Sequence, residues 1–426
     1  MKWWHRSTQR ILLDCKEKGQ ILSLQKPPVI FMIPSSVRDQ KPDLFKPQVV
    51  SIGPFHREDK ILQEFEEQKT THLHHLLECL NIQAEIVLDE CLQKVNASIP
   101  KIRACYGGGI SCKDDELEKM MVMDACFILD FLFLSEEHRR FTSRNAILTH
   151  SIFRDLVLLD NQIPFFVLQD IFDCTIHKIQ TGSLASGVLE QFRFLIPFKG
   201  IRNNDATQLP HHILGLLQRS FHPTCNIPST RPPLKDPNHS ALELDEAGVK
   251  FKPNNNDGNH WPLAIDFSSS SFEFFRWCWG NRTLRMPTLH IDDNTELFFR
   301  NVIAYEQCTP EVPDYVTSYV CAIDMLTDTK KDVSRLVKSK VLTNHLGSNK
   351  DATKMLNDIS KQFVFEEFYY KDQWEQLHKY YDGYVPQNIA LLKRTYFSSP
   401  WKIIALLAAI ILFTLAIIQT VLRIIK

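Results

Sequence analysis

The sequence lacks an excess of charge of either sign. Its 49 Lys and Arg residues face 50 Asp and Glu residues, which leaves a net charge of −1 over 426 residues. A protein that holds nucleic acid on a broad basic surface carries a large positive charge, so nucleic acid is not a predicted partner. The start of the chain, MKWWHRSTQR, also lacks the apolar run of about 7–15 residues found in a secretory signal peptide.

Familiar catalytic motifs are missing as well. The sequence has no G-x-S-x-G elbow, no H-E-x-x-H zinc motif and no C-x-x-C pair. The run Gly107–Gly109 is not followed by the Gly-Lys-Ser/Thr of a phosphate-binding P-loop. We therefore expect no catalytic residue, no cofactor and no metal ion, although an enzyme could still assemble its site from distant residues.

Cysteine is present, but not in the pattern of a disulfide framework. The count of 11 is odd, and Cys91, Cys126 and Cys278 lie among apolar residues, where a free thiol packs as a small hydrophobic group. Cys105 and Cys112 flank the glycine run and form the one pair that is plausible as a bridge or as metal ligands.

Charge is absent from one long apolar run, Ile403–Leu422, which is 20 residues long. A helix of this length spans about 30 Å, the thickness of the hydrocarbon layer of a bilayer. Trp401 and Lys402 precede the run, and Arg423 and Lys426 follow it, as interfacial anchors do. We predict a single-pass transmembrane helix that contacts lipid, with nearly the whole chain on one side.

Two alternatives exist for this run. A buried core helix would normally keep a polar stripe. A signal for a glycolipid anchor would need a polar spacer of about 8–12 residues after a small residue such as Ser398 or Ser399, and the apolar run begins too soon after them.

The sequence gives only a weak indication of the side of the membrane on which the body lies. Lys393, Arg394 and Lys402 precede the span and fewer cations follow it, which favours a cytosolic body at the plasma membrane or an endomembrane. A role in recognition between cells would favour the other side. The sequons at Asn96, Asn238 and Asn281 matter only if the body is luminal.

Helical periodicity dominates the rest of the chain. Helices are expected from about Lys60, and an amphipathic stripe runs over residues 84–95 until Pro100 ends it. Met120–Leu134 is apolar nearly all round and predicts a central buried helix, and Leu156–Phe172 is a second apolar segment that restarts at Pro164. The fold class is therefore mainly α.

Local signals place further elements. Thr329 with Asp332, and Ser348 with Asp351, have the spacing of capping boxes at helix starts. Short strands are predicted at residues 29–33, 249–252 and 261–267. The chain divides into a loosely ordered segment (1–27), a helical globular domain (28–392) with a loop-rich insertion at about 200–260, a juxtamembrane segment (393–402), the membrane helix (403–422) and a short tail (423–426).

Six blocks of the sequence match a known plant family in order. They are IPSSVRDQKPDLFKPQVVSIGPFH (Ile33–His56), MDACFILDFL (Met123–Leu132), DLVLLDNQIPFFVL (Asp155–Leu168), ALELDEAGVKF (Ala241–Phe251), FRNVIAYEQC (Phe299–Cys308) and TYFSSPW (Thr395–Trp401). Over residues 28–426 the chain resembles the family called domain of unknown function 247, although Phe45, Phe55 and Asp160 replace its usual Tyr, Tyr and Glu. The resemblance implies a C-terminal membrane span and no established activity. Some members are linked to self-incompatibility, that is, pollen–stigma recognition in grasses.

Several polar residues are candidates for chemistry. Asp124 and Asp130 lie in the most apolar helix and are expected to accept structural hydrogen bonds, with an acid role as the alternative. Asp160, Asn161 and Gln162 are expected to cap the break before Pro164. His72, His74, His75 and Glu78 form the densest metal-capable cluster, but Leu73, Leu76, Leu77 and Leu80 predict that these histidines lie on or beside the solvent-exposed face of their helix.

The function that this sequence favours is recognition. We expect a membrane-anchored module that binds a protein or peptide, with specificity in the Pro-rich stretch at residues 223–240. The aromatic residues at 272–275, 277 and 279 are expected to pack in the core, with a partner surface as the alternative. Two other functions stay open: a hydrolase-like enzyme with a site near Asp155–Pro164, and a passive membrane scaffold.

Overall fold

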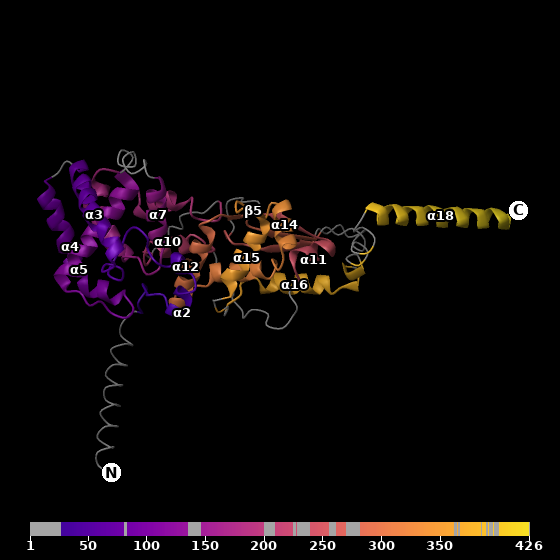
Figure 1. The fold of residues 1–426 in the computed structure, drawn as a ribbon, viewed down its shortest axis with the longest axis horizontal. Coiled ribbons are helices and arrows are strands. Elements are labelled where there is room, and N and C mark those ends of the chain that lie inside the picture. Colours follow the sequence, from indigo (N-terminus) through magenta and orange to yellow (C-terminus); the bar gives the residue numbers. More distant parts are fainter. Residues whose placement is uncertain are drawn as a thin grey trace, which may run out of the picture.

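The computed structural model describes residues 27–425 apart from 81–82, 135–145, 200–208, 225–226, 228–238, 255–260, 270–281, 362–363, 365–366, 385, 389–390, 392–394 and 396–399. The fold is mainly α, as predicted, with an elongated body from which one long helix projects (Figure 1). Predicted features outside the described residues are the N-terminal segment up to residue 26, most of the Pro-rich stretch, the aromatic residues at 272–279, Cys278 and the sequons at Asn238 and Asn281.

Three long helices pack side by side at one end of the body (Figure 1). α3 (Lys60–Cys79) begins at the predicted residue, where the side chain of Asp59 accepts a hydrogen bond from the Ile61 N–H. α4 (Ala84–Ala104) and α3 both contact α5 (Asp114–Leu129), which continues into a π-helical turn, η2 (Asp130–Leu134). α5 is buried along most of its length, which confirms the predicted central helix.

The prediction that Pro100 ends the second of these helices is wrong. α4 contains Pro100 and continues to Ala104. A proline inside a helix removes one hydrogen bond and costs about 3 kcal/mol. Ile99 and Ile102 are buried on the same face as Val95, and their packing offsets that cost.

The remaining helices complete the body. Those that precede the sheets are α2 (Ser35–Arg38), η1 (Pro42–Leu44), α7 (Ala146–Asp155), α8 (Phe165–Cys174), η4 (Ile176–Lys178), α9 (Leu184–Phe192), α10 (Ile213–Arg219) and α11 (Ala241–Glu246). Those that follow are α12 (Thr295–Cys308), α13 (Tyr315–Asp324), α14 (Lys330–Lys338), α15 (Asn349–Ser360) and α16 (Lys371–Tyr381). α10 lies inside the predicted loop-rich insertion and is buried, so the described part of that range contains packed helix.

Two small sheets cover the second half of the body. β1 (Val249–Pro253) pairs parallel with β3 (Arg282–Met286), and β2 (Asp266–Ser269) pairs antiparallel with β3. β4 (Leu289–Ile291) pairs parallel with β5 (Leu342–Asn344). β1 confirms the predicted strand at 249–252, whereas the strand predicted at 261–267 begins only at Asp266, and the one predicted at 29–33 is a single bridge from Ile30 to Tyr106.

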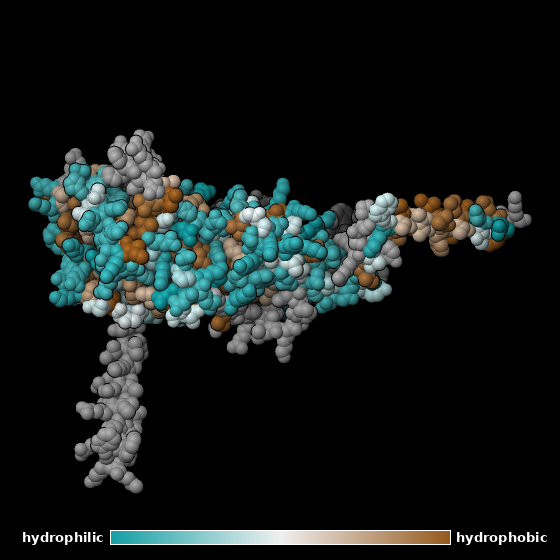
Figure 2. Space-filling view, in the orientation of Figure 1, coloured by the Kyte–Doolittle hydropathy of each residue, from teal (hydrophilic) through white to brown (hydrophobic). Residues whose placement is uncertain are grey.

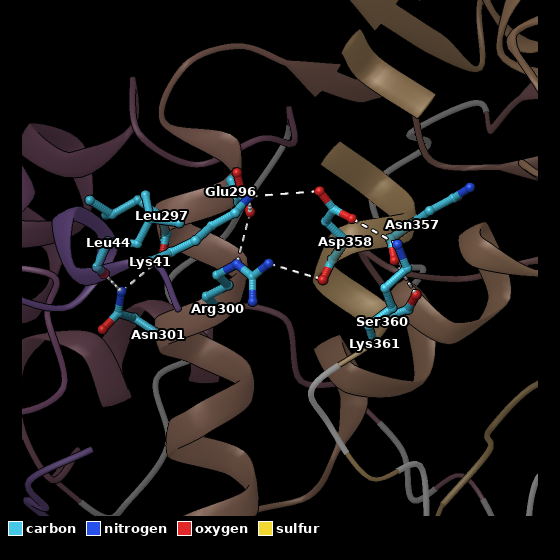
Figure 3. A network of polar contacts seen from close by, with 10 residues as sticks. All are labelled: Lys41, Leu44, Glu296, Leu297, Arg300, Asn301, Asn357, Asp358, Ser360 and Lys361. Carbon is cyan, nitrogen blue, oxygen red and sulfur yellow. Dashed lines mark hydrogen bonds and ion pairs between the residues drawn. The ribbon is translucent and has the colours of Figure 1, made fainter. Parts of the chain in front are cut away.

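A polar network around α12 joins distant parts of the chain (Figure 3). The fully buried Arg300 donates to Glu296, 2.9 Å away, and to the backbone oxygen of Asp358 on α15, also 2.9 Å away. Lys41 binds the same Glu296, and Asn301 donates to the Leu44 oxygen. α12 therefore holds both residues 41–44 and α15.

The last helix, α18 (Pro400–Ile425), has the composition of a membrane span. An 18-residue stretch within Trp401–Ile424 has a mean hydropathy of 2.6, and none of that stretch is buried against the body. Figure 2 shows hydrophobic side chains over most of this helix, while the visible face of the body is mainly hydrophilic. By length and composition, α18 is long and apolar enough to cross a membrane, and it includes the whole predicted span.

Candidate functional site

The structure pairs Asp124 with a lysine that the sequence did not single out. Lys69 on α3 and Asp124 on α5 are both fully buried, and their charged ends are 2.6 Å apart. The other carboxylate oxygen of Asp124 accepts the Gly53 N–H at 2.7 Å, and Lys69 also donates to the Ser51 oxygen and to Glu66. Burial raises the pKa of Asp124, while Lys69 opposes that rise. Asp124 thus holds α3 and residues 51–53 against α5.

Asp130 binds two of the histidines of the predicted metal-capable cluster. The Nδ1 atoms of His72 and His75 each lie 2.6 Å from its carboxylate. The expectation that these histidines lie on or beside the exposed face of the helix is wrong for His72, which lies on the buried face of α3 with Leu62, Phe65, Lys69 and Leu76. His74 is exposed beside Glu78, and no group of three metal-binding side chains occurs among the described residues.

The polar residues before Pro164 bind backbone groups. Gln162 donates to the Leu156 and Leu158 oxygens, as expected of a residue that caps the end of α7. Asn161 instead reaches the 48–53 segment, where it accepts the Ile52 N–H and donates to the Val50 oxygen. The buried Asp160 lies 3.0 Å from Nε2 of His56.

Asp155, the end of α7, holds the same segment. Its carboxylate accepts three consecutive backbone N–H groups, those of Gln48, Val49 and Val50. Burial raises the pKa of Asp155 to about 6, although these three donors favour the ionised form. Asp155, Asn161 and Gln162 therefore support neighbouring backbone, with which their polar atoms are engaged, whereas the side-chain partner of Asp160 is His56.

Cys105 and Cys112 are both free thiols. Gly108 and Gly109 between them have positive φ angles of 88° and 81°, which explains the glycine run as a turn in left-handed backbone. Of the three sequons, Asn96 lies in the described residues and is exposed on α4.

The most distinctive cleft lies elsewhere and was missed by the sequence analysis. It has a volume of about 590 Å³ and is formed by the end of α12, the turn that leads into α13, and a segment before α16. We call it the acidic cleft. Its lining residues are Glu306, Gln307, Pro310, Glu311, Val312, Pro313, Asp314, Val364, Glu367 and Tyr369. Four of these carry carboxylates, and none is Lys, Arg or His.

Glu306 forms the floor of the acidic cleft and binds the start of α13. Its carboxylate accepts the N–H groups of Val316 and Thr317, the Thr317 hydroxyl at 2.6 Å and the side-chain amide of Gln218 at 2.8 Å. A carboxylate at this position satisfies backbone donors that a helix start leaves without partners. Burial nevertheless raises the pKa of Glu306 to about 7, against the lowering by Thr317 and Gln218.

The walls of the acidic cleft connect to the Pro-rich stretch. The Gln307 amide donates to the Val364 oxygen, and the Tyr369 hydroxyl donates to Glu367 at 2.5 Å. The Tyr369 ring lies 4.6 Å from that of Tyr315, which in turn lies 5.2 Å from His222. The stretch at 223–240 therefore begins next to the cleft.

A signal for this cleft exists in the sequence but is faint. The turn reads TPEVPD over residues 309–314, in which acidic residues alternate with prolines directly after the apolar α12. Prolines keep such a turn out of the helix and leave its carboxylates at the surface. The partner segment at 364–369 begins 50 residues after the end of this turn, and no pattern in the sequence links the two.

We expect Glu306→Gln to change the pH dependence of stability. The ordinary pKa of 4.5 applies to the unfolded chain and a pKa of about 7 to the folded chain. The folded state then binds the proton more tightly, so the contribution of Glu306 to stability is complete below pH 4.5 and is lost as the pH rises to about 7. Relative to the Gln variant, the wild type should lose about 3 kcal/mol of unfolding free energy over that range.

Chemical denaturation of both full-length proteins in detergent, at several pH values between 4.5 and 7.5, measures this difference. The titration of Asp155 contributes equally to the pH dependence of both proteins, so it cancels in the difference between them. If the unfolding free energy of the wild type instead rose with pH relative to that of the Gln variant, the four hydrogen-bond donors, and not burial, would determine the pKa of Glu306.

Comparison with known proteins places the chain in a family. It is 28% identical to the "UPF0481 protein At3g47200" of Arabidopsis thaliana over 93% of this chain and 86% of that protein. A second UPF0481 protein of the same plant, At3g02645, is 24% identical over 92% of this chain and 89% of that protein. No solved structure matches. The family model described as "plant protein of unknown function" matches residues 30–415, so the chain belongs to the plant family of domain of unknown function 247.

Proposed function

We propose that this protein is a membrane-anchored recognition module, not an enzyme, and that its body binds a basic segment of a partner protein in the acidic cleft. The observation that carries this proposal is the lining of the cleft, which contains the four acidic residues Glu306, Glu311, Asp314 and Glu367 and no cation among the described lining residues. Complementary charge of this kind guides a partner to one face and excludes partners of the wrong sign. The volume of about 590 Å³ suits several side chains of a peptide.

The cleft also offers apolar contacts. Pro310, Val312 and Pro313 form one wall and the Tyr369 ring contributes to another. The aliphatic stems of Lys and Arg pack on such surfaces while their charged ends reach the carboxylates. A basic peptide therefore fits both the charge and the shape of the lining.

The Pro-rich stretch at 223–240 is proposed to select among basic partners. Its first residues adjoin the cleft through His222 and Tyr315. Segments of this composition do not build a core, and loops on a rigid scaffold commonly carry binding specificity. The rigid scaffold here is α12 with α13.

Anchoring by α18 supports a role at a membrane surface, at the plasma membrane or an endomembrane. A cytosolic position of the body agrees with the cations Lys393, Arg394 and Lys402 before the span. It also agrees with the eight free thiols in the described part of the chain, since disulfides are rare in the cytosol.

The two alternatives receive less support. A hydrolase near Asp155–Pro164 would need free polar groups that a substrate can reach. Asp155 and Asn161 are engaged with backbone groups of residues 48–52, and the Asp160 carboxylate, which accepts no hydrogen bond among the described residues, is buried beside His56. A passive scaffold gives no reason for converging carboxylates in a cleft.

Neutralising two cleft carboxylates tests the proposal. The full-length protein in a non-ionic detergent is titrated with a fluorescent octa-lysine peptide. The double variant Glu311→Gln and Glu367→Gln should bind the peptide about tenfold more weakly, or ~1.4 kcal/mol, because each lost charge removes an attraction that salt also screens. Its melting temperature should stay unchanged, since Glu311 is exposed and glutamine at 367 still accepts from Tyr369.

The matched control removes two exposed carboxylates from distant helices, Glu67→Gln on α3 and Glu85→Gln on α4. Equal weakening by both pairs would mean general attraction to the surface and would refute binding at the cleft. In the same assay, deletion of residues 228–237 should alter which sequences are selected from a library of basic peptides. Unaltered selection would remove the Pro-rich stretch from the proposal.

A further inference from the structure

One lysine adopts a backbone conformation that normally belongs to glycine. Among the described residues, φ is positive at five glycines and at only one other residue, Lys340, where it is 63°. The Lys340 N–H bonds to the Val337 oxygen and the Val341 N–H to the Leu336 oxygen, so α14 ends in a Schellman motif with lysine at the left-handed position. Glycine is the preferred residue there because it has no Cβ to clash. A side chain kept at a strained position points to a use for that side chain.

Lys340 lines a pocket of about 560 Å³ next to the small sheet of β4 and β5. We call this the lysine pocket. Its polar lining includes Lys199, Asn254, His290, Lys340, Thr343 and Asn344, and no Asp or Glu lines it among the described residues. Lys340 forms no salt bridge within the described part of the chain. The pocket thus collects positive charge and hydrogen-bond donors.

His290 adds an unused polar atom to this pocket. Its Nε2 is shielded from solvent and has no hydrogen-bond partner among the described residues. Burial, together with Lys199 and His345, lowers the pKa of His290, so the ring is uncharged at neutral pH and offers hydrogen bonding without a further charge. A ring nitrogen that is shielded from water and has no hydrogen-bond partner reduces the stability of the fold, unless a ligand supplies the missing hydrogen bond.

The end of α14 does not oppose an anion here. The last carbonyl groups of a helix carry partial negative charge. In α14 the Leu336 and Val337 oxygens accept the Schellman hydrogen bonds, and the Thr288 hydroxyl donates to the Lys340 oxygen. These carbonyl groups are therefore engaged by donors of the chain itself.

We propose that the lysine pocket binds the phosphate group of a phosphate-bearing ligand through Lys199, His290 and Lys340. A phosphate group has several strong acceptor oxygens and a charge that two ammonium groups neutralise. The volume of the pocket leaves room for the organic part of such a ligand. This inference is independent of the acidic cleft, which has the opposite charge.

Lys340→Gly separates ligand binding from folding. It removes the side chain and also relieves the left-handed backbone, so the melting temperature should stay the same or rise. Binding of pyrophosphate to the full-length protein in non-ionic detergent, measured by calorimetry, should weaken at least fivefold. Lys340→Arg should retain binding within about twofold, because the charge stays. The matched control, Lys338→Gln, removes an exposed cation from the same helix outside the pocket and should leave binding unchanged.

A second titration uses dioctanoyl phosphatidic acid below its micellar concentration. Tighter binding of this lipid than of pyrophosphate identifies a lipid headgroup as the ligand, and the reverse order identifies a soluble phosphate compound. The proposal is overturned if the wild type binds neither probe, or if the Lys340→Gly and wild-type proteins bind them equally.

Discussion

Replacing Lys69 by methionine should destabilise the protein by about 3–5 kcal/mol, because it leaves a buried carboxylate without its counter-charge. Methionine has nearly the length of lysine, so little volume is lost. Asp124 would keep only the Gly53 N–H as a donor, at 2.7 Å. The Ser51 oxygen, now 2.5 Å from the Lys69 ammonium, would lose that donor as well. Chemical denaturation of the full-length protein in detergent measures the change.

Companion variants distinguish the ion pair from other effects of the substitution. Asp124→Asn should cost less, about 1–3 kcal/mol, because Glu66 still neutralises Lys69 at 2.6 Å. The double variant Lys69→Met with Asp124→Leu should recover part of the loss, since an apolar pair can replace a buried ion pair. Lys60→Met, on the exposed first turn of the same helix, should change stability by no more than about 0.5 kcal/mol. A loss below about 1 kcal/mol for Lys69→Met would show that Asp124 does not depend on this partner.

Truncation after Ser399 should move the protein from the membrane fraction to the soluble fraction. Thirteen of the 20 residues in Ile403–Leu422 are Ile, Leu, Phe or Val, which favours insertion by about 4–8 kcal/mol at most. The hydroxyls of Thr414 and Thr420 bond to helix oxygens one turn earlier, so they present no unsatisfied donor to lipid. Fractionation with an alkaline carbonate wash measures the change.

Two further variants control for the deletion itself. Arginine at both Leu412 and Leu415 keeps the length of α18 but should prevent insertion, at about 2.5–3.5 kcal/mol per residue. Isoleucine at the same two positions should leave the protein in the membrane. A truncated protein that still resists the carbonate wash would reveal a second anchor in the body, and soluble full-length protein would mean that α18 is no anchor at all.

Local signals in the sequence located much of the fold. The start of α3, the central helix α5 and the strand β1 lie where periodicity places them. The capping box of Thr329 and Asp332 is present at the start of α14, and the Ser348 hydroxyl accepts the Asp351 N–H at the start of α15. These features depend on neighbours within one or two helical turns, which a sequence pattern records.

The errors share a different cause, which is a partner far away in the chain. His72 lies on the inner face of α3 because Asp130, 58 residues further on, accepts its hydrogen bond. Nothing local distinguishes such a histidine from one that faces water. The acidic cleft likewise needs residues 306–314 and 364–369 together, and the lysine pocket needs four separate segments. Sites assembled from segments this far apart have no characteristic residue spacing by which the sequence could reveal them.

The way in which residues 48–53 are held has a consequence for synthesis on the ribosome. Backbone N–H groups of this segment bind side chains of Asp124, Asp155 and Asn161, which are made 71–109 residues later. The partner of Lys41, Glu296, is made later still, 255 residues downstream. Residues 41–53 therefore leave the ribosome long before the side chains that hold them, and the helical half that they complete stays unfinished until α12 has been made.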